Sequence, residues 1–122
     1  MAAVSRSRQF SKRGLALTAP VFYILLSLSL KERHGYEILK DVQASSADRV
    51  RLGPGTLYTT LKRMLEAGLI AELDSGSRPD QDDTRRRYYR LTEQGRADLN
   101  GELSRMKEAL KLASPRQLKA SS

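Results

Sequence analysis

The sequence predicts a mainly α-helical fold with one small β-hairpin. Two apolar segments in the first half have helical spacing, and a third, opened by Gly53-Pro54, adds a polar opposite face. After it, two short runs rich in apolar and aromatic residues flank a loop without any apolar residue, which is typical of a hairpin. The chain of 122 residues is long enough for one such domain with an appended helix.

The first predicted helix runs from about Ala19 to Lys31. Its apolar residues cover nearly the whole circumference: Val21, Phe22, Ile24, Leu25, Leu26, Leu28 and Leu30. A helix that is apolar on all sides must be covered on more than one side. We do not expect so small a domain to supply that cover alone, so the pattern points to a second subunit.

The same apolar run, from Leu15 to Leu30, follows basic residues and in that respect resembles a signal peptide. Thr18 and Pro20 interrupt it and are typical of a helix start. No Ala-x-Ala-like cleavage site follows, and the run is shorter than the roughly 20 residues that a membrane span needs. We therefore expect a buried helix in a cytoplasmic protein, with no membrane partner.

The next two helices follow closely. His34-Gly35 breaks the chain, and the second helix is expected from about Tyr36 to Ser45. Val50 to Leu52 is predicted as a short strand. The third helix begins at Pro54, whose missing N–H costs nothing in a first turn, and Gly68 closes it as a left-handed C-cap.

The third helix has two different faces. Its apolar stripe follows the spacing i, i+4, i+7 and i+8: Leu57, Leu61, Met64 and Leu65. The other side presents hydroxyls and cations: Thr56, Thr59, Lys62 and Arg63. Such a helix, packed by its stripe, can place its polar face in a DNA major groove. Gly55 lies in the first turn, where free N–H groups suit a phosphate, and Tyr58 lies on the border of the two faces.

The hairpin is predicted from two strands, Leu69 to Leu73 and Arg87 to Leu91. Tyr88 and Tyr89 should point to opposite faces of the sheet because strand side chains alternate. Three consecutive arginines, Arg85, Arg86 and Arg87, lie where the loop enters the second strand. They repel one another, and a phosphate backbone relieves that repulsion. In the free protein, we expect them to pair with the loop acids Asp80, Asp82 and Asp83.

The fourth helix extends from its N-cap, Thr92, to Ala113, before Pro115. Its apolar residues are spaced 4, 3, 4 and 3 apart, which is a coiled-coil seam: Leu99, Leu103, Met106, Leu110 and Ala113. Three helices followed by a hairpin are the order of a winged helix-turn-helix. The sequence thus predicts a disordered basic arm (1–14), a winged helix-turn-helix DNA-binding domain (15–91), a dimerisation helix (92–113) and a loose tail (114–122).

The amino-acid composition limits the classes of function that are open to the chain. The formal net charge is +8 and the isoelectric point is about 10.1, which favours a polyanionic partner. The chain has no cysteine and one histidine, so thiolate metal sites and a histidine-based triad are excluded. No nucleophile with a base and no phosphate-binding glycine motif is present. We expect no enzyme, no metal and no cofactor.

Three segments together resemble the PadR family of transcriptional regulators. They are His34-Gly35-Tyr36-Glu37-Ile38, the run from Gly55-Thr56-Leu57-Tyr58 to Gly68-Leu69-Ile70, and Arg87-Tyr88-Tyr89-Arg90-Leu91-Thr92-Glu93-Gln94-Gly95-Arg96. The resemblance spans about Leu15 to Ala113, in the family order. The single C-terminal helix is similar to the short subclass. Some of its members bind aromatic drugs at the dimer interface through tryptophan; this chain has none, which argues against the same site.

The resemblance implies a homodimeric repressor whose C-terminal helix packs against the partner near its first helix. Residues expected at that interface are Phe22, Leu25, Leu99, Leu103, Met106 and Leu110. The expected partner is double-stranded DNA with a pseudo-palindromic operator, bound through Gly55, Thr56, Tyr58, Thr59, Lys62, Arg63, Arg85, Arg86 and Arg87. Two alternatives stay open: a winged-helix protein-interaction module without DNA binding, and a sensor with its main site for a small-molecule effector at the dimer interface.

Overall fold

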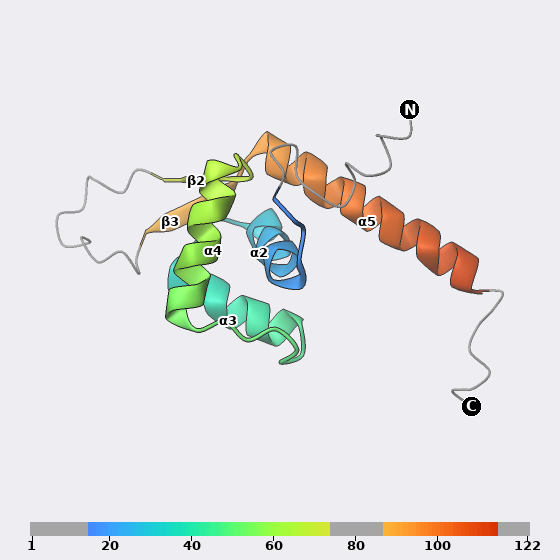
Figure 1. The fold of residues 1–122 in the computed structure, drawn as a ribbon, viewed down its shortest axis with the longest axis horizontal. Helices are drawn as coiled ribbons and strands as arrows, with labels where there is room; N and C mark the ends of the chain where they lie inside the picture. The colour runs from blue at the N-terminus through green and yellow to red at the C-terminus, as the bar shows by residue number, and fades with distance from the viewer. Residues whose placement is uncertain (1–14, 74–86, 115–122) are drawn as a thin grey trace.

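The computed structural model describes residues 15–73 and 87–114 (Figure 1). The helices are α2 (Ala19–Leu30), α3 (Gly35–Ser45), α4 (Pro54–Glu66) and α5 (Glu93–Ala113), and the strands are β1 (Arg33–His34), β2 (Ile70–Glu72) and β3 (Tyr88–Leu91). The strands form one antiparallel sheet in the order β1-β3-β2. The predicted fold class, a mainly helical winged helix-turn-helix with a further C-terminal helix, is confirmed.

The sheet has one strand more than the predicted hairpin, and the predicted strand from Val50 to Leu52 is wrong. β1 pairs with β3, so that His34 lies opposite Tyr88. Val50 instead lies in the turn between α3 and α4, where its backbone N–H donates to Ser46 Oγ at 2.9 Å. The Ser46 hydroxyl also donates to the Val50 carbonyl at 3.4 Å, so both backbone groups of Val50 bond within the turn and not to a strand.

α2 lies at the centre of the domain, packed on α3, α5 and β3 (Figure 1). Four of its apolar residues are at most 4 % exposed: Val21, Ile24, Leu25 and Leu28. The chain itself therefore covers one side of this apolar helix, and the cover of the other side by a second subunit stays a prediction. Three of its large apolar residues are half-buried, namely Phe22, Tyr23 and Leu26, and Leu30 is 76 % exposed. Within the described residues, no helix is both long enough and apolar enough to cross a membrane.

α3 begins with a capping box formed by His34 and Glu37. The backbone N–H of Glu37 donates to His34 Nδ1 at 3.2 Å, and the backbone N–H of His34 donates to Glu37 Oε1 at 3.0 Å. These bonds satisfy N–H groups that a helix start leaves free. The turn to α4 contains two left-handed residues, Ala47 (φ 54°) and Asp48 (φ 67°). This turn sets the angle at which α4 leaves α3.

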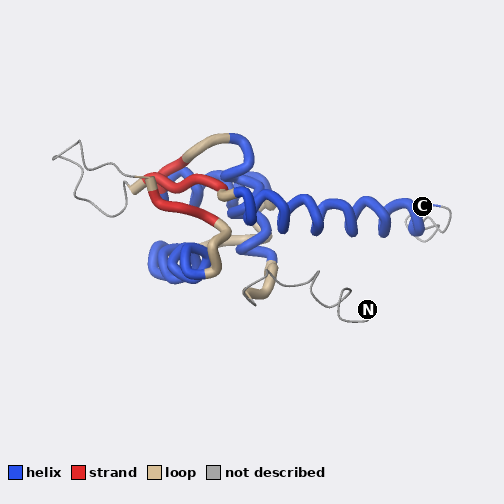
Figure 2. Tube along the Cα trace, turned by 90° about the horizontal axis from the view of Figure 1, so that it is seen from above, coloured by secondary structure: helices blue, strands red, loops and turns tan. Residues whose placement is uncertain are grey.

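The caps at the end of α4 and at the start of α5 are those that the sequence predicts. Gly68 is left-handed, with φ 79°. Thr92 caps α5, because its Oγ1 accepts a hydrogen bond from the Gly95 backbone N–H at 3.0 Å. From there α5 runs for 21 residues. Its second half extends away from the other elements (Figures 1 and 2).

Candidate nucleic-acid interface

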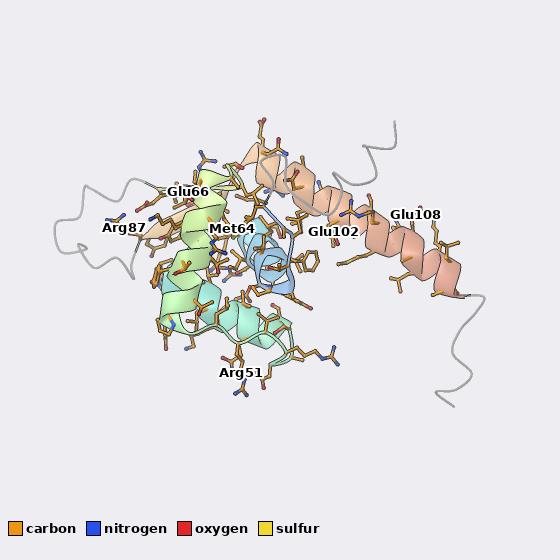
Figure 3. All side chains as sticks on the ribbon, in the orientation of Figure 1. Arg51, Met64, Glu66, Arg87, Glu102 and Glu108 are labelled. Atoms are coloured by element: carbon orange, nitrogen blue, oxygen red, sulfur yellow. The ribbon has the colours of Figure 1, made fainter. Side chains whose placement is uncertain are left out.

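The inner side of α4 is anchored in the hydrophobic core. Leu57 and Leu61 are 1 % exposed and Met64 is 0 % exposed. Figure 3 shows Met64 on the side of α4 that faces α2. Leu65 completes the stripe and is half-buried. Because this stripe packs on the core, the direction in which the opposite face points is determined by the fold.

The outer side of α4 is open to solvent. Thr56, Thr59, Lys62 and Arg63 are all exposed, as predicted for a surface that meets a partner. Gly55 is exposed as well, and a Cβ built on it would touch no other atom within 4 Å. Among the described residues, neither Lys62 nor Arg63 forms an ion pair. These cations can therefore meet a phosphate without first losing a described ion-pair partner.

Two further hydroxyls of α4 are less available. Thr60 donates to the Thr56 carbonyl at 2.8 Å, which occupies its hydroxyl proton within the helix. Tyr58 is half-buried, and its ring lies against Gly35, where a Cβ atom would come within 2.9 Å of Tyr58 Cζ. Gly35 thus makes room for Tyr58. The side chain that the sequence left on the border between the two faces of α4 packs against the start of α3.

The wing is described only in part. Arg85 and Arg86 lie outside the described residues, as do Asp80, Asp82 and Asp83. Arg87 is exposed, and its guanidinium pairs with Glu72 on β2, with 2.8 Å between Nη1 and Oε2. Figure 3 shows Arg87 beside β3. For this arginine, the described partner is a strand residue rather than one of the predicted loop acids.

The two tyrosines of β3 point to opposite faces, as predicted. Tyr89 is 4 % exposed and belongs to the core. Burial raises its pKa to about 12, helped by the negative charge of Glu72 and by Tyr58, while Arg87 acts in the opposite direction. Tyr88 is half-buried, and its ring meets the His34 ring edge-on, with 5.4 Å between centroids.

Sequence reasoning missed the pairing of an aromatic and a cation on α3. Tyr36, at the start of α3, is 57 % exposed, and Lys40 Nζ lies 5.0 Å from the centre of its ring. Tyr36 follows Gly35, the residue that contacts Tyr58 of α4. The i, i+4 spacing of an aromatic and a cation was the available signal.

The six residues expected at a dimer interface fall into two groups. Leu25 is 1 % exposed and Leu99 is 2 % exposed, so both belong to the core of their own chain, and Phe22 is half-buried. Leu103, Met106 and Leu110 are 38 %, 40 % and 70 % exposed along the projecting part of α5. These three leave an apolar surface that no described residue covers.

The fold and this surface define a winged helix-turn-helix protein with a basic outer face on the helix before the wing. The model of the "Transcriptional regulator PadR-like family" matches residues 24–101. The chain therefore belongs to the PadR-like family of transcriptional regulators, as its motifs indicated. Members of this family are regulators of transcription rather than enzymes as a class.

Solved structures agree with this assignment. A PadR family transcription regulator from Clostridium difficile R20291 is 30% identical, with a TM-score of 0.64, over 80% of this chain and 97% of that one. A PadR-like transcription factor from Bacteroides fragilis shares the fold at 21% identity, with a TM-score of 0.59, over 93% of this chain and 97% of that one. A MarR family regulator is also similar in fold, at 21% identity and a TM-score of 0.67. No curated protein matches the chain.

Proposed function

We propose that this chain is a sequence-specific DNA-binding repressor that acts as a homodimer on a pseudo-palindromic operator. The observation that carries the proposal is the outer face of α4. It presents exposed hydroxyls and two cations that form no ion pair with the described residues, on a helix whose other side is anchored in the core. Thr59, Lys62 and Arg63 have the side chains that bond base edges and phosphates in a major groove.

Around α4, the neighbouring elements supply phosphate contacts. Arg87 on the wing side is an exposed cation, and its surface ion pair with Glu72 is of a kind worth only about 0–1 kcal/mol. A phosphate can displace such a partner. The sequence adds Arg85 and Arg86 at the same place in the chain. The net charge of +8 favours association with DNA at every step.

The proposal of a dimer is supported by the exposed apolar residues of α5. Leu103, Met106 and Leu110 continue the spacing of Leu99 along a helix that extends away from its own domain. A seam with this spacing fits an identical seam, so we take a second copy of the chain as its partner. A two-fold pair of α4 helices would read half-sites about one helical turn apart, roughly 34–36 Å.

Selection of duplexes from a random pool, followed by footprinting upstream of the protein's own gene, tests the proposal. We expect a protected pseudo-palindrome and an affinity that falls steeply as salt rises. Absence of salt-dependent binding to any duplex would instead leave a protein-interaction module. DNA binding that a small molecule abolishes would favour the alternative of a small-molecule sensor.

Variants of α4 test which residues read the operator. We expect Lys62→Ala and Arg63→Ala each to weaken operator binding by about 1–3 kcal/mol, as measured by fluorescence anisotropy. Lys111→Ala is the matched control, because it removes the same charge from the projecting end of α5. If Lys111→Ala weakened binding as much as Lys62→Ala, net charge and not the face of α4 would determine the affinity.

A further inference from the structure

The end of α4 and the start of α5 are connected by side-chain and backbone bonds across 24 residues of sequence. Thr92 Oγ1 donates to the Gly68 carbonyl at 2.6 Å, and the Thr92 backbone N–H donates to the Leu69 carbonyl at 3.1 Å. The same Thr92 hydroxyl accepts the bond from Gly95 that caps α5. We call the residues Gly68, Leu69, Thr92 and Gly95 the α4–α5 joint.

The joint is close-packed as well as hydrogen-bonded. A Cβ atom on Gly95 would overlap the Leu69 carbonyl oxygen and come within 2.9 Å of Leu91 Cδ1. On the other side, the Leu69 backbone N–H donates to the Met64 carbonyl at 3.0 Å, so the joint continues directly into α4. The last turn of α4 and the first turn of α5 are thus one hydrogen-bonded unit.

Beyond the joint, the first half of α5 packs on α2, and its second half projects from the domain. Leu99, one turn beyond the joint, is 2 % exposed, whereas Leu103 and Leu110 are 38 % and 70 % exposed. Leu110 lies about 22 Å beyond Gly95 at a rise of about 1.5 Å per residue. A swing of about 10° at the joint would move that point by about 4 Å, which exceeds the rise of about 3.4 Å per base pair of DNA.

We propose that the α4–α5 joint sets the operator spacing that the dimer accepts, with Thr92 and Gly95 as positioning residues. This inference rests on the proposed function, because it requires α4 to read DNA and α5 to join two copies. Thr92 contacts no DNA in this arrangement. It holds the direction of α5 relative to α4, and that direction determines how far apart the two α4 helices lie.

The sharpest variant is Thr92→Asp, with Thr92→Ser as its matched control. Aspartate still caps α5, but its carboxylate cannot donate to the Gly68 carbonyl. Serine keeps both bonds. Each full-length protein is titrated against its operator, against duplexes with one base pair added or removed between the half-sites, and against a single half-site. The ratio between two duplexes cancels the change in net charge.

We expect the wild type and Thr92→Ser to bind the altered spacings at least about tenfold more weakly, because DNA must deform to fit a rigid dimer. Thr92→Asp should reduce that penalty to about threefold or less, with half-site affinity within about twofold of the wild type. Retention of the full wild-type penalty by Thr92→Asp would overturn the inference. If the wild type bound no duplex, or showed no spacing preference, the proposed function would fail and this inference with it.

A second measurement needs no DNA. The chain contains no cysteine, so Ala44→Cys on α3 and Asn100→Cys on α5, both at exposed positions, take spin labels selectively. Diluted with unlabelled protein, the doubly labelled chain should give a narrow distance distribution that broadens in Thr92→Asp and not in Thr92→Ser. An unchanged distribution would count against the joint. Should Thr92→Asp not fold, Thr92→Val, which removes the same donor without adding a charge, takes its place in both experiments.

Discussion

α4 and α5 are both amphipathic helices, yet they leave opposite faces exposed. In α4 the apolar stripe is buried by the chain itself, with Leu61 at 1 % exposure, and the polar face remains. In α5 burial ends after Leu99, and Leu110 is 70 % exposed. The same kind of pattern therefore has two consequences. A helix whose apolar stripe is buried in its own core leaves its polar face exposed. A helix that projects from the domain leaves its apolar face exposed.

The largest expected effect tests the buried half of this comparison. Leu61→Ala should lower the free energy of unfolding by about 2–5 kcal/mol, because it leaves a cavity where the side chain is fully enclosed. Leu112→Ala, at a position 61 % exposed, removes the same atoms and should change it by less than about 0.5 kcal/mol. Urea denaturation of both variants measures the difference. Equal losses would mean that α5 is buried in solution as deeply as α4.

The exposed half of the comparison is tested by dimerisation. Leu110→Ala should raise the dimer dissociation constant at least about tenfold, because a two-fold interface loses the buried side chain twice. Leu112→Ala is again the control, since two residues along a helix its side chain points nearly opposite to that of Leu110. Sedimentation equilibrium measures the constant. A monomeric wild type, or an equal effect of the two variants, would contradict the seam.

Tyr89 of β3 belongs to the same core as the apolar stripe of α4, and the pH dependence of stability tests its burial there. Its pKa is raised to about 12, whereas the ordinary pKa of a tyrosine in an unfolded chain is 10.0. Between these values the unfolded state has lost the proton and the folded state retains it. The resulting stability is complete below pH 10 and is lost as pH rises towards 12, by about 1–3 kcal/mol.

Tyr89→Phe should remove that part of the pH dependence. Denaturation at pH 9 and at pH 11 measures it, and Tyr88→Phe, at the half-buried neighbour, is the control. If Tyr89→Phe lost stability between these two pH values as steeply as the wild type, the decline would come from other groups.

Local periodicity predicted much of this fold. The inner and outer faces of α4, the alternation of Tyr88 and Tyr89, the left-handed Gly68 and the Thr92 cap are all short-range features, and the structure confirms them. The strand β1 was missed because it has two residues, and its pairing with Tyr88 depends on a partner far along the chain.

Assigning apolar residues to a core or to an interface was harder. Leu25 and Leu99 have the same helical spacing as exposed neighbours, and the sequence does not say whether that face meets the same chain or another. Only the packing of α2 on α3, α5 and β3 assigns both residues to the core. Within the predicted site, the exposure of the residues on α4 follows from the period of the helix. Tyr58 needed the structure, because its contact with Gly35 joins two helices.

The smallest expected effect concerns Arg87, where the sheet next to α4 meets solvent. Its ion pair with Glu72 has side chains 48 % and 32 % exposed, so Glu72→Gln should change the free energy of unfolding by less than about 1 kcal/mol. The same change frees Arg87 for a phosphate. We therefore expect Glu72→Gln to raise affinity for the operator about twofold at low salt, and Arg87→Ala to reduce the salt slope by about 1. Anisotropy titrations across a range of salt concentrations measure both. If Glu72→Gln weakened binding instead, the ion pair would orient Arg87 towards DNA. The Glu72 carboxylate would then position Arg87 and would not compete with the phosphate for it.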